Sequence, residues 1–164
     1  MININNAVQF QHLIWDRIMK SASVVVDATC GNGHDLLYLA ERAQSECHLY
    51  GIDIQEQAVS ASRELLASKK LQSNVTITFL HNSHDIALHQ EIKENTIDLI
   101  IFNLGYLPGG DHSIVTQPKN TIEALNNAFP KLAKDGIITI VAYPGTPEGM
   151  EEKEALHTHI SQLV

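Results

Sequence analysis

The sequence is short of cysteine, of long apolar runs and of basic residues. Its two cysteines, Cys30 and Cys47, lack the dense, even pattern of secreted disulfide scaffolds, so we expect a reduced, cytoplasmic setting. No stretch approaches the ~20 apolar residues of a membrane span, and no basic segment followed by an apolar one marks a signal peptide. The sequence therefore predicts no membrane partner.

Basic residues are outnumbered, because 11 Lys and Arg stand against 19 Asp and Glu and the formal net charge is −8. Proteins that bind nucleic acid over a broad electrostatic surface are basic. The charge argues against such a surface, although it is compatible with a local basic strip. Any RNA partner should therefore be recognised through shape, base stacking and a pocket.

The 164 residues, 44% of them apolar, predict one globular domain over residues 1–164. Short apolar runs alternate with helical patterns, which predicts an α/β fold with a doubly wound, mainly parallel sheet. The expected strands are 24–29, 48–53, 75–80, 97–102 and 136–142, and the expected helices are 7–20, 35–44, 55–69, 118–133 and 151–162. The predicted buried stripes are Phe10, Ile14 and Ile18 in the first helix and Ile122, Leu125, Phe129 and Leu132 in the fourth.

A third glycine is missing from the turn that follows the first expected strand. The run VVVDATCGNG (24–33) ends a β-branched strand in a carboxylate and continues into a Gly-x-Gly turn. A dinucleotide-binding fingerprint needs a further glycine where Leu36 stands, and Asp35 at the helix start would repel a pyrophosphate. The turn therefore does not fit a dinucleotide.

S-adenosylmethionine fits this turn better, because it has no phosphate and carries a sulfonium cation. We predict that Asp27 faces the ammonium group of this cofactor. The backbone around Gly31, Asn32 and Gly33 is expected to approach its carboxylate. The alternative is an ordinary strand–helix turn with polar caps.

A second carboxylate, Asp53, closes the second expected strand twenty residues after Gly33. A carboxylate offers two acceptor oxygens, so Asp53 is predicted to take both ribose hydroxyls, with Gln55 near the adenosine. The alternative for Asp53 is a cap of the next helix.

Ser83 and His84 follow the third expected strand, where a doubly wound domain usually contacts the adenine, and we assign both to the cofactor. His81 and His84 also have the spacing of a zinc pair. No third strong ligand lies nearby in the sequence, so no metal is predicted.

The fourth expected strand runs directly into NLGY (103–106), which resembles the Asn-Pro-Pro-Tyr signature of methyltransferases that act on exocyclic amines. An amine nucleophile needs two acceptors for its hydrogens if its lone pair is to face a methyl group. The Asn103 side-chain oxygen and the Leu104 carbonyl can supply them, and Tyr106 can stack on a base. The alternative is a turn with a left-handed asparagine.

Asp111 and His112 follow in the same loop and are candidates for substrate contact and for removal of a proton. A solvated loop is the alternative for both. Asn103, Tyr106 and Asp111 are the predicted catalytic residues.

These segments make the chain similar to a small bacterial family of Rossmann-like class I methyltransferases that was first labelled as rRNA methylases and later assigned to tRNA. The resemblance rests on DATCGNGHD (27–35), GIDIQ (51–55) and above all NLGYLPGGDH (103–112). The chain departs at Leu36, where relatives often have threonine. Doubly wound methyltransferases normally end in two more strands that form an antiparallel edge. This sequence ends in the expected helix 151–162, so we expect the C-terminal edge strands to be missing from it.

The resemblance implies methylation of the 5-aminomethyl group of a 2-thiouridine at the tRNA wobble position, giving 5-methylaminomethyl-2-thiouridine. It implies S-adenosylmethionine as cofactor, a tRNA anticodon stem-loop as partner and a homodimer. The residues that it assigns to the cofactor are Asp27, Asn32, Gly33, Asp53, Gln55, Ser83 and His84. The residues that it assigns to the substrate are Asn103, Tyr106, Leu107, Pro108, Asp111 and His112.

Two other functions are compatible with the residues. The first is methylation of an rRNA base or a small-molecule amine. The second is a non-catalytic module that binds the cofactor and uses the sheet for interactions, which Asn103 and Tyr106 beside the donor site disfavour.

Overall fold

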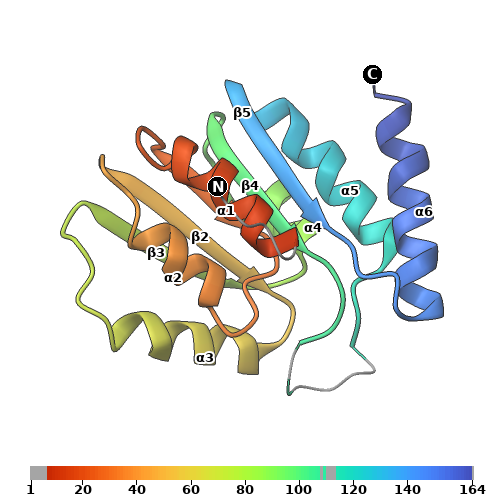
Figure 1. Ribbon diagram of the computed structural model, residues 1–164, viewed down its shortest axis with the longest axis horizontal. Helices are drawn as coiled ribbons and strands as arrows, with labels where there is room; N and C mark the ends of the chain where they lie inside the picture. Colours follow the sequence, from red (N-terminus) through yellow and green to blue (C-terminus); the bar gives the residue numbers. More distant parts are fainter. Residues whose placement is uncertain (1–6, 108, 110–113, 164) are drawn as a thin grey trace.

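Five parallel strands form one sheet in the order β3-β2-β1-β4-β5 (Figure 1). The computed structural model describes residues 7–107, 109 and 114–163. The strands are β1 (Val24–Asp27), β2 (Cys47–Asp53), β3 (Val75–His81), β4 (Ile97–Asn103) and β5 (Leu132–Val141). The predicted doubly wound parallel sheet is confirmed.

Helices cover both faces of this sheet (Figure 1). One face carries α1 (Ala7–Ile18), α2 (His34–Ala40) and α3 (Glu56–Ala67), and the other carries α4 (His84–Ile86), the π-helical turn η1 (Ala87–Glu91), α5 (Pro118–Ala128) and α6 (Pro147–Ser161). Successive strand residues point to opposite faces, so Val25 packs with Trp15 while Val26 packs with Phe102. All four of these side chains are fully buried, which explains why the central strands read as continuous apolar runs.

The predicted stripe of α1 is wrong by one position. Phe10 is 54% exposed, whereas Trp15 is fully buried and donates from Nε1 to Thr139 Oγ1 on β5 at 3.1 Å. The large indole and its hydrogen bond fix the rotation of the helix, which leaves Ile14 and Ile18 half-buried. Helix α1 therefore packs over β4 and β5, and the turn before Trp15, which carries His12, lies at the carboxyl end of the sheet.

The predicted fourth helix is too long. Helix α5 ends at Ala128, a 3₁₀ turn η2 (Phe129–Lys131) follows, and β5 begins at Leu132. Pro130 has no backbone N–H and cannot continue a helix, so Phe129 becomes exposed and Leu132 joins the sheet. The short helical segment 84–91 between β3 and β4 was not predicted, because it is too brief to show a period.

The carboxyl ends of β1, β2 and β4 lie at one edge of the sheet, where the chain order switches direction around β1. Ligands of doubly wound domains bind at such a switch point. Asp27, Asp53 and Asn103 are the last residues of these three strands. No helix in the part of the chain that the structure describes is long and apolar enough to cross a membrane.

Candidate functional site

Asp27 lies at the base of this edge. It pairs in register with Gly51 and Ile101, so β2 and β4 each extend two residues beyond it, to Asp53 and Asn103. Only 1% of the side chain is exposed. Burial and the charges of Asp35 and Asp53 raise the pKa of Asp27 well above its usual value, while the Thr29 N–H, which donates to Oδ1 at 3.1 Å, opposes the shift. A cationic ligand would stabilise the ionised form.

The predicted glycine turn adopts the left-handed backbone that its residues allow, with φ of +49° at Gly31 and +83° at Gly33. Gly33 also permits close contact with α3, because a Cβ there would lie 2.8 Å from Ser62 Cα. Ser62 Oγ donates to Gly31 O at 2.8 Å and fixes the turn on the helix. Asn32, half-buried, lies between the two glycines. Contacts with α3 therefore support the conformation of the turn.

Asp53 joins this turn to the start of α3. Its Oδ2 accepts from the Gly31 N–H at 3.0 Å and its Oδ1 accepts from the Gln55 N–H at 2.9 Å. The N-cap residue of α3 is Gln55, so Asp53 stands two positions before the cap. Burial raises the pKa of Asp53, and the backbone donors of Gln55 and Gly31 oppose this shift. Each carboxylate oxygen retains a lone pair that a ligand hydroxyl could use.

Ser83 and His84 follow β3 and have different surroundings. Ser83 is the N-cap residue of α4, and its N–H donates to Asn82 Oδ1 at 2.9 Å. His84 is 8% exposed and packs edge-on against Phe102, with ring centroids 5.7 Å apart. Burial lowers the pKa of His84, and its Nε2 has no hydrogen-bond partner among the described residues. Burial therefore favours the neutral imidazole, and its buried Nε2 keeps an unused hydrogen-bonding capacity.

His81 and His84, which have the spacing of a zinc pair, lie in different environments. His81 is exposed and its Nε2 is 3.0 Å from Ile54 O, whereas His84 lies in the core. Within the described residues, no group of three His, Cys, Asp or Glu side chains could hold a metal ion.

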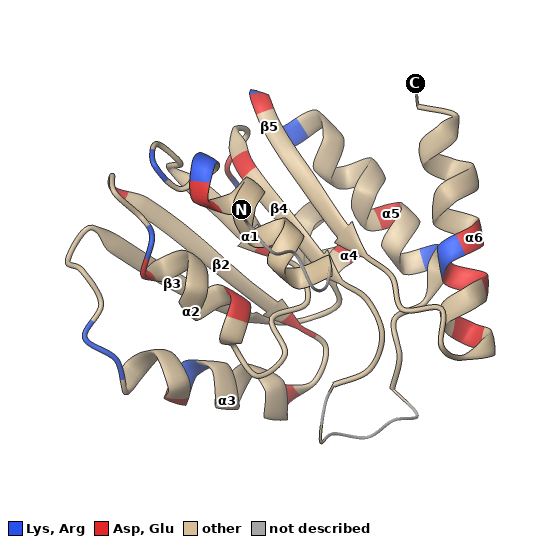
Figure 2. Ribbon diagram, in the orientation of Figure 1, with Lys and Arg blue, Asp and Glu red and all other residues tan. Residues whose placement is uncertain are grey.

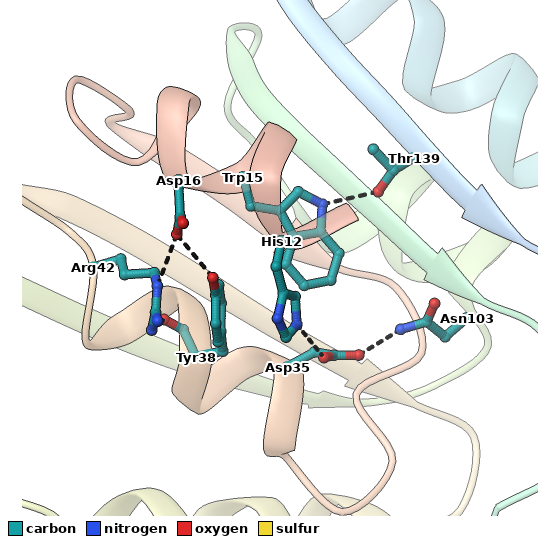
Figure 3. Close-up of polar contacts among 8 residues, drawn as sticks. All are labelled: His12, Trp15, Asp16, Asp35, Tyr38, Arg42, Asn103 and Thr139. Carbon is teal, nitrogen blue, oxygen red and sulfur yellow. Dashed lines mark hydrogen bonds and ion pairs between the residues drawn. The ribbon is translucent and has the colours of Figure 1, made fainter. Parts of the chain in front are cut away.

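Asn103 is fixed from two sides, and Figure 3 shows the contact of its side chain with Asp35. Its backbone N–H donates to Thr29 Oγ1 at 2.8 Å, and its Nδ2 donates to Asp35 Oδ2 at 2.5 Å. Its Oδ1 is buried and has no partner in the described part of the chain. A buried acceptor without a partner costs about 1–3 kcal/mol, so it calls for an explanation, and at this edge of the sheet a ligand is one.

The segment after Asn103 is tied to α5 and α6. Gly105 donates from its N–H to Thr116 Oγ1 at 2.9 Å and accepts from the Thr116 N–H at 3.0 Å. Thr116 Oγ1 donates to Glu152 Oε2 at 2.5 Å, and Thr121 Oγ1 donates to Glu152 Oε1 at 2.7 Å. Glu152, on α6, is 3% exposed. These contacts hold the segment by both polar groups of the Gly105 backbone.

Tyr106 follows this anchored glycine, and its ring is accessible. It forms an antiparallel bridge with Val115 and is 49% exposed. Leu107 is 6% exposed, and its Cδ1 lies 3.5 Å from where a Cβ of Gly31 would stand. Leu107 packs against the glycine turn, and its contact with substrate stays a prediction. Pro108, Asp111 and His112 lie outside the described residues.

Three residues near the site were not predicted from the sequence. Asp35 bonds to Asn103, Glu152 anchors Thr116, and Tyr143 follows β5 with 53% exposure. Burial and the charge of Asp35 raise the pKa of Tyr143, so the Tyr143 hydroxyl is close enough to Asp35 to be affected by its charge. Tyr143 could have been found by asking which residues follow β5 at the same edge. Glu152 carries no such signal.

Comparison with known proteins connects this geometry to one group. Residues 49–164 match the family described as "Putative rRNA methylase". The chain is 32% identical over 163 residues to the chloroplastic tRNA (mnm5s2U34)-methyltransferase of Arabidopsis thaliana, covering 96% of this chain and 60% of that protein.

Two solved structures are similar over nearly the whole chain. One is the crystal structure of a protein described as a "putative rRNA-methylase" from Clostridium thermocellum, with a TM-score of 0.88, 37% identity and coverage of 98% of this chain and 84% of that one. The other is SMU.1697c from Streptococcus mutans, described as a "putative methyltransferase" in complex with SAH (S-adenosylhomocysteine). It has a TM-score of 0.83 and 29% identity, and the match covers 99% of this chain and 85% of that one.

Proposed function

Since this chain belongs to the rRNA methylase family, we propose that it is a methyltransferase that uses S-adenosylmethionine to methylate a primary amine on RNA. The acceptor that we propose is the 5-aminomethyl group of 2-thiouridine at position 34 of tRNA, and the product is 5-methylaminomethyl-2-thiouridine. The Arabidopsis relative carries the name of this activity, but the chain spans only 60% of that protein. The observation that carries the proposal is the buried, unpartnered Oδ1 of Asn103.

The cofactor fits the residues at the edge of the sheet. Three carboxylates, Asp27, Asp35 and Asp53, surround the glycine turn, and two of them have raised pKa values that a cation would lower. No Lys or Arg is among the site residues described above, which suits a ligand with a sulfonium, an ammonium group and a ribose but no phosphate. Asp27 would hold the ammonium group, Asp53 the ribose hydroxyls, and the Gly31–Gly33 backbone the carboxylate. The SAH complex of the Streptococcus mutans structure supports this assignment.

When bound, S-adenosylmethionine supplies an electrophilic methyl group on sulfur. Asn103 Oδ1 and the Leu104 carbonyl would accept the two hydrogens of the amine, so that its lone pair faces the methyl carbon. Tyr106 would stack on the base. A free alkylamine has a pKa of about 10.4, and deprotonating it near pH 7 costs roughly 4–5 kcal/mol at 1.36 kcal/mol per unit. Desolvation in the site and the nearby sulfonium charge both favour the neutral amine.

The family description favours one alternative, an rRNA base as acceptor. No specific observation favours a small-molecule amine as acceptor, and none favours a non-catalytic role for the protein. The tRNA partner, the homodimer, the single domain and a cytoplasmic setting stay predictions.

Two substitutions separate the proposed roles. Asn103→Ala should lower kcat far more than cofactor affinity, because Oδ1 orients the lone pair chiefly in the transition state. Tyr106→Ala should weaken binding of the nucleotide by about 1–3 kcal/mol, the usual range for base stacking, and largely preserve the rate at saturating RNA. Steady-state kinetics with labelled methyl donor measure both. Equal loss of kcat in the two variants, or full activity of Asn103→Ala, contradicts the proposal.

A further inference from the structure

Three polar side chains from three elements form a chain of contacts that ends at the proposed acceptor site (Figure 3). His12 comes from α1, Asp35 from the first turn of α2 and Asn103 from the end of β4. His12 Nε2 lies 3.5 Å from Asp35 Oδ1, and Asn103 Nδ2 lies 2.5 Å from Asp35 Oδ2. Each of the two carboxylate oxygens of Asp35 therefore contacts a different residue.

Asp35 determines which way the Asn103 amide faces. An ionised carboxylate can only accept hydrogen bonds, so the NH₂ end of the amide must face Asp35 and the oxygen must face away. The backbone of Asn103 is held in place, because its N–H donates to Thr29 Oγ1 at 2.8 Å and the residue pairs with Val141 in the sheet. The buried Oδ1, without a partner among the described residues, is thus presented as an acceptor.

His12 is itself held on a rigid support. Its ring stacks on Tyr38 with centroids 3.6 Å apart and planes inclined by 20°, and it lies 5.0 Å from the Trp15 ring. The Tyr38 hydroxyl donates to Asp16 at 2.9 Å, and the Arg42 guanidinium lies 3.3 Å from the Tyr38 ring centroid. Helix α1, which sequence patterning treated only as a packing element, thereby reaches the site.

We propose that Asp35 is a positioning residue that, supported by His12, directs Oδ1 of Asn103 toward the acceptor amine. This inference rests on the proposed function. In the reaction, the nitrogen lone pair forms the N–C bond, the C–S bond breaks with its electron pair going to sulfur, and the new ammonium loses a proton to solvent. The charged and titratable groups that face Asp35 are His12 from α1, Asp27 from β1 and Tyr143 from the segment after β5.

The first test uses the protein without any ligand. The side-chain amide protons of Asn103 are assigned by their loss from an NMR spectrum of Asn103→Ala, and their exchange with solvent is then measured in Asp35→Ala. The hydrogen bond to Asp35 should slow this exchange in the wild type, and Asp35→Ala should accelerate it at least tenfold. Asp98→Ala is the matched control, because Asp98 Oδ2 accepts from the Ser23 and Val24 N–H groups at the opposite end of β1 and β4. Unchanged exchange in Asp35→Ala overturns the inference.

The second test is a double-mutant cycle on methyl transfer. Asp35→Asn places a second amide opposite Asn103, which removes the preference for one orientation, and should lower kcat by about 10- to 100-fold while the KM for RNA changes less than about twofold. In the Asn103→Ala background the same substitution should have almost no effect, because Asp35 acts through Asn103. A full additive loss in that background shows a separate role for Asp35 and overturns the inference, while the proposed function stands.

A third variant tests the support from α1. His12→Phe keeps a ring to stack on Tyr38 but cannot bond to Asp35, and should lower kcat by about 3- to 10-fold. His12→Gln, which restores a donor, should recover most of this loss. No difference between the two variants overturns the role of His12. If the wild type transfers no methyl group to any aminomethyl stem-loop, the proposed function falls and the assigned amine with it, whatever the amide exchange shows.

Discussion

At the scale of single residues, Asp27 is the clearest case of a side chain whose environment is costly without a ligand. It is 1% exposed and has two other carboxylates nearby, which together raise its pKa. Asp27→Asn keeps the acceptor for the Thr29 N–H and removes the buried charge. We expect this variant to have a higher free energy of unfolding than the wild type at neutral pH, because an amide carries no charge to desolvate. Chemical denaturation measures this, and a destabilised Asp27→Asn contradicts the assignment.

The same residue gives a pH dependence of cofactor binding. Its pKa in the folded protein is raised, so the folded state holds a proton that the unfolded chain has already released, and stability falls as pH rises between the two pKa values. A cationic ligand favours ionised Asp27 and expels that proton, so affinity should rise with pH across this window. Calorimetry in two buffers of different ionisation enthalpy detects the released proton. Asp27→Asn should abolish the release, and equal release by this variant contradicts the role of Asp27.

Asp53 makes a separate prediction at this scale. Asp53→Ala removes a two-oxygen contact with the ribose and should weaken S-adenosylmethionine binding by about 1.5–3 kcal/mol. It also frees the Gly31 and Gln55 N–H groups, so the glycine turn loses one support. Asp98→Ala, which removes a carboxylate from two backbone N–H groups at the other end of the sheet, is the control and should bind normally. Unchanged affinity in folded Asp53→Ala contradicts the ribose assignment.

Sequence reasoning found the residues whose place depends on strand ends, and it missed those whose place depends on packing. Asp27, Asp53 and Asn103 each follow an apolar run, and parallel strands bring their carboxyl ends to one edge. Asp35 was seen only as a charge that a pyrophosphate would avoid. Its contacts with His12 and Asn103 depend on how α1 and α2 pack on the sheet, which no local pattern records.

At the scale of elements, helices α5 and α6 and the segment after β4 are joined through two threonine hydroxyls and one buried carboxylate. Thr116 accepts from Gly105 and donates to Glu152, so it links the segment after β4 to α6. Thr116→Val keeps the shape of the side chain but leaves the Gly105 N–H and Glu152 Oε2 each without this partner. We expect a loss of about 1–3 kcal/mol in the free energy of unfolding.

Thr158→Val is the matched control for that substitution, because Thr158 is exposed on α6 and bonds only to Glu154 O in the described contacts. It should change stability by no more than about 0.5 kcal/mol. Thermal and denaturant unfolding of both variants measures the difference. Equal stability of Thr116→Val and the wild type contradicts the role assigned to this link.

The elements themselves were predictable where periodicity is long and not where it is brief or overridden. The five strands and their parallel direction follow from short apolar runs that alternate with helices. The register of α1 did not follow, because a single indole that bonds to β5 outweighed the stripe of Phe10, Ile14 and Ile18. The end of α5 was missed because apolar spacing was given more weight than Pro130.

At the scale of the whole molecule, the negative net charge and the acidic residues around the proposed site disfavour electrostatic attraction of RNA over a broad surface. Figure 2 shows acidic residues at the carboxyl end of β2 and in the first turns of α2 and α3, around the proposed cofactor site. Helices α5 and α6 also begin at this edge, and they carry Lys119 and Lys153 in their first two turns. These two exposed lysines are our candidates for contact with phosphates.

Binding of an anticodon stem-loop should therefore depend only weakly on salt. Two phosphate contacts predict a slope of log K against log salt near −1.4 on single-stranded RNA, at about −0.7 per contact. The Lys119→Ala/Lys153→Ala double variant should flatten this slope toward zero. The Lys69→Ala/Lys70→Ala variant, with changes after α3 at the opposite edge of the sheet, should leave it unchanged. Fluorescence anisotropy at several salt concentrations measures it, and a steep slope that neither variant alters contradicts this docking edge.

The most direct measurement is methyl transfer from labelled S-adenosylmethionine to two anticodon stem-loops that differ only at position 34. One carries 5-aminomethyl-2-thiouridine and the other an unmodified uridine, which offers no alkylamine. Asn103 Oδ1 and the segment that follows it suit an amine, so label should enter the first stem-loop and not the second, and mass spectrometry should find 5-methylaminomethyl-2-thiouridine. Transfer to the unmodified stem-loop at a comparable rate, or transfer to rRNA alone, would contradict the amine mechanism and the proposed substrate together.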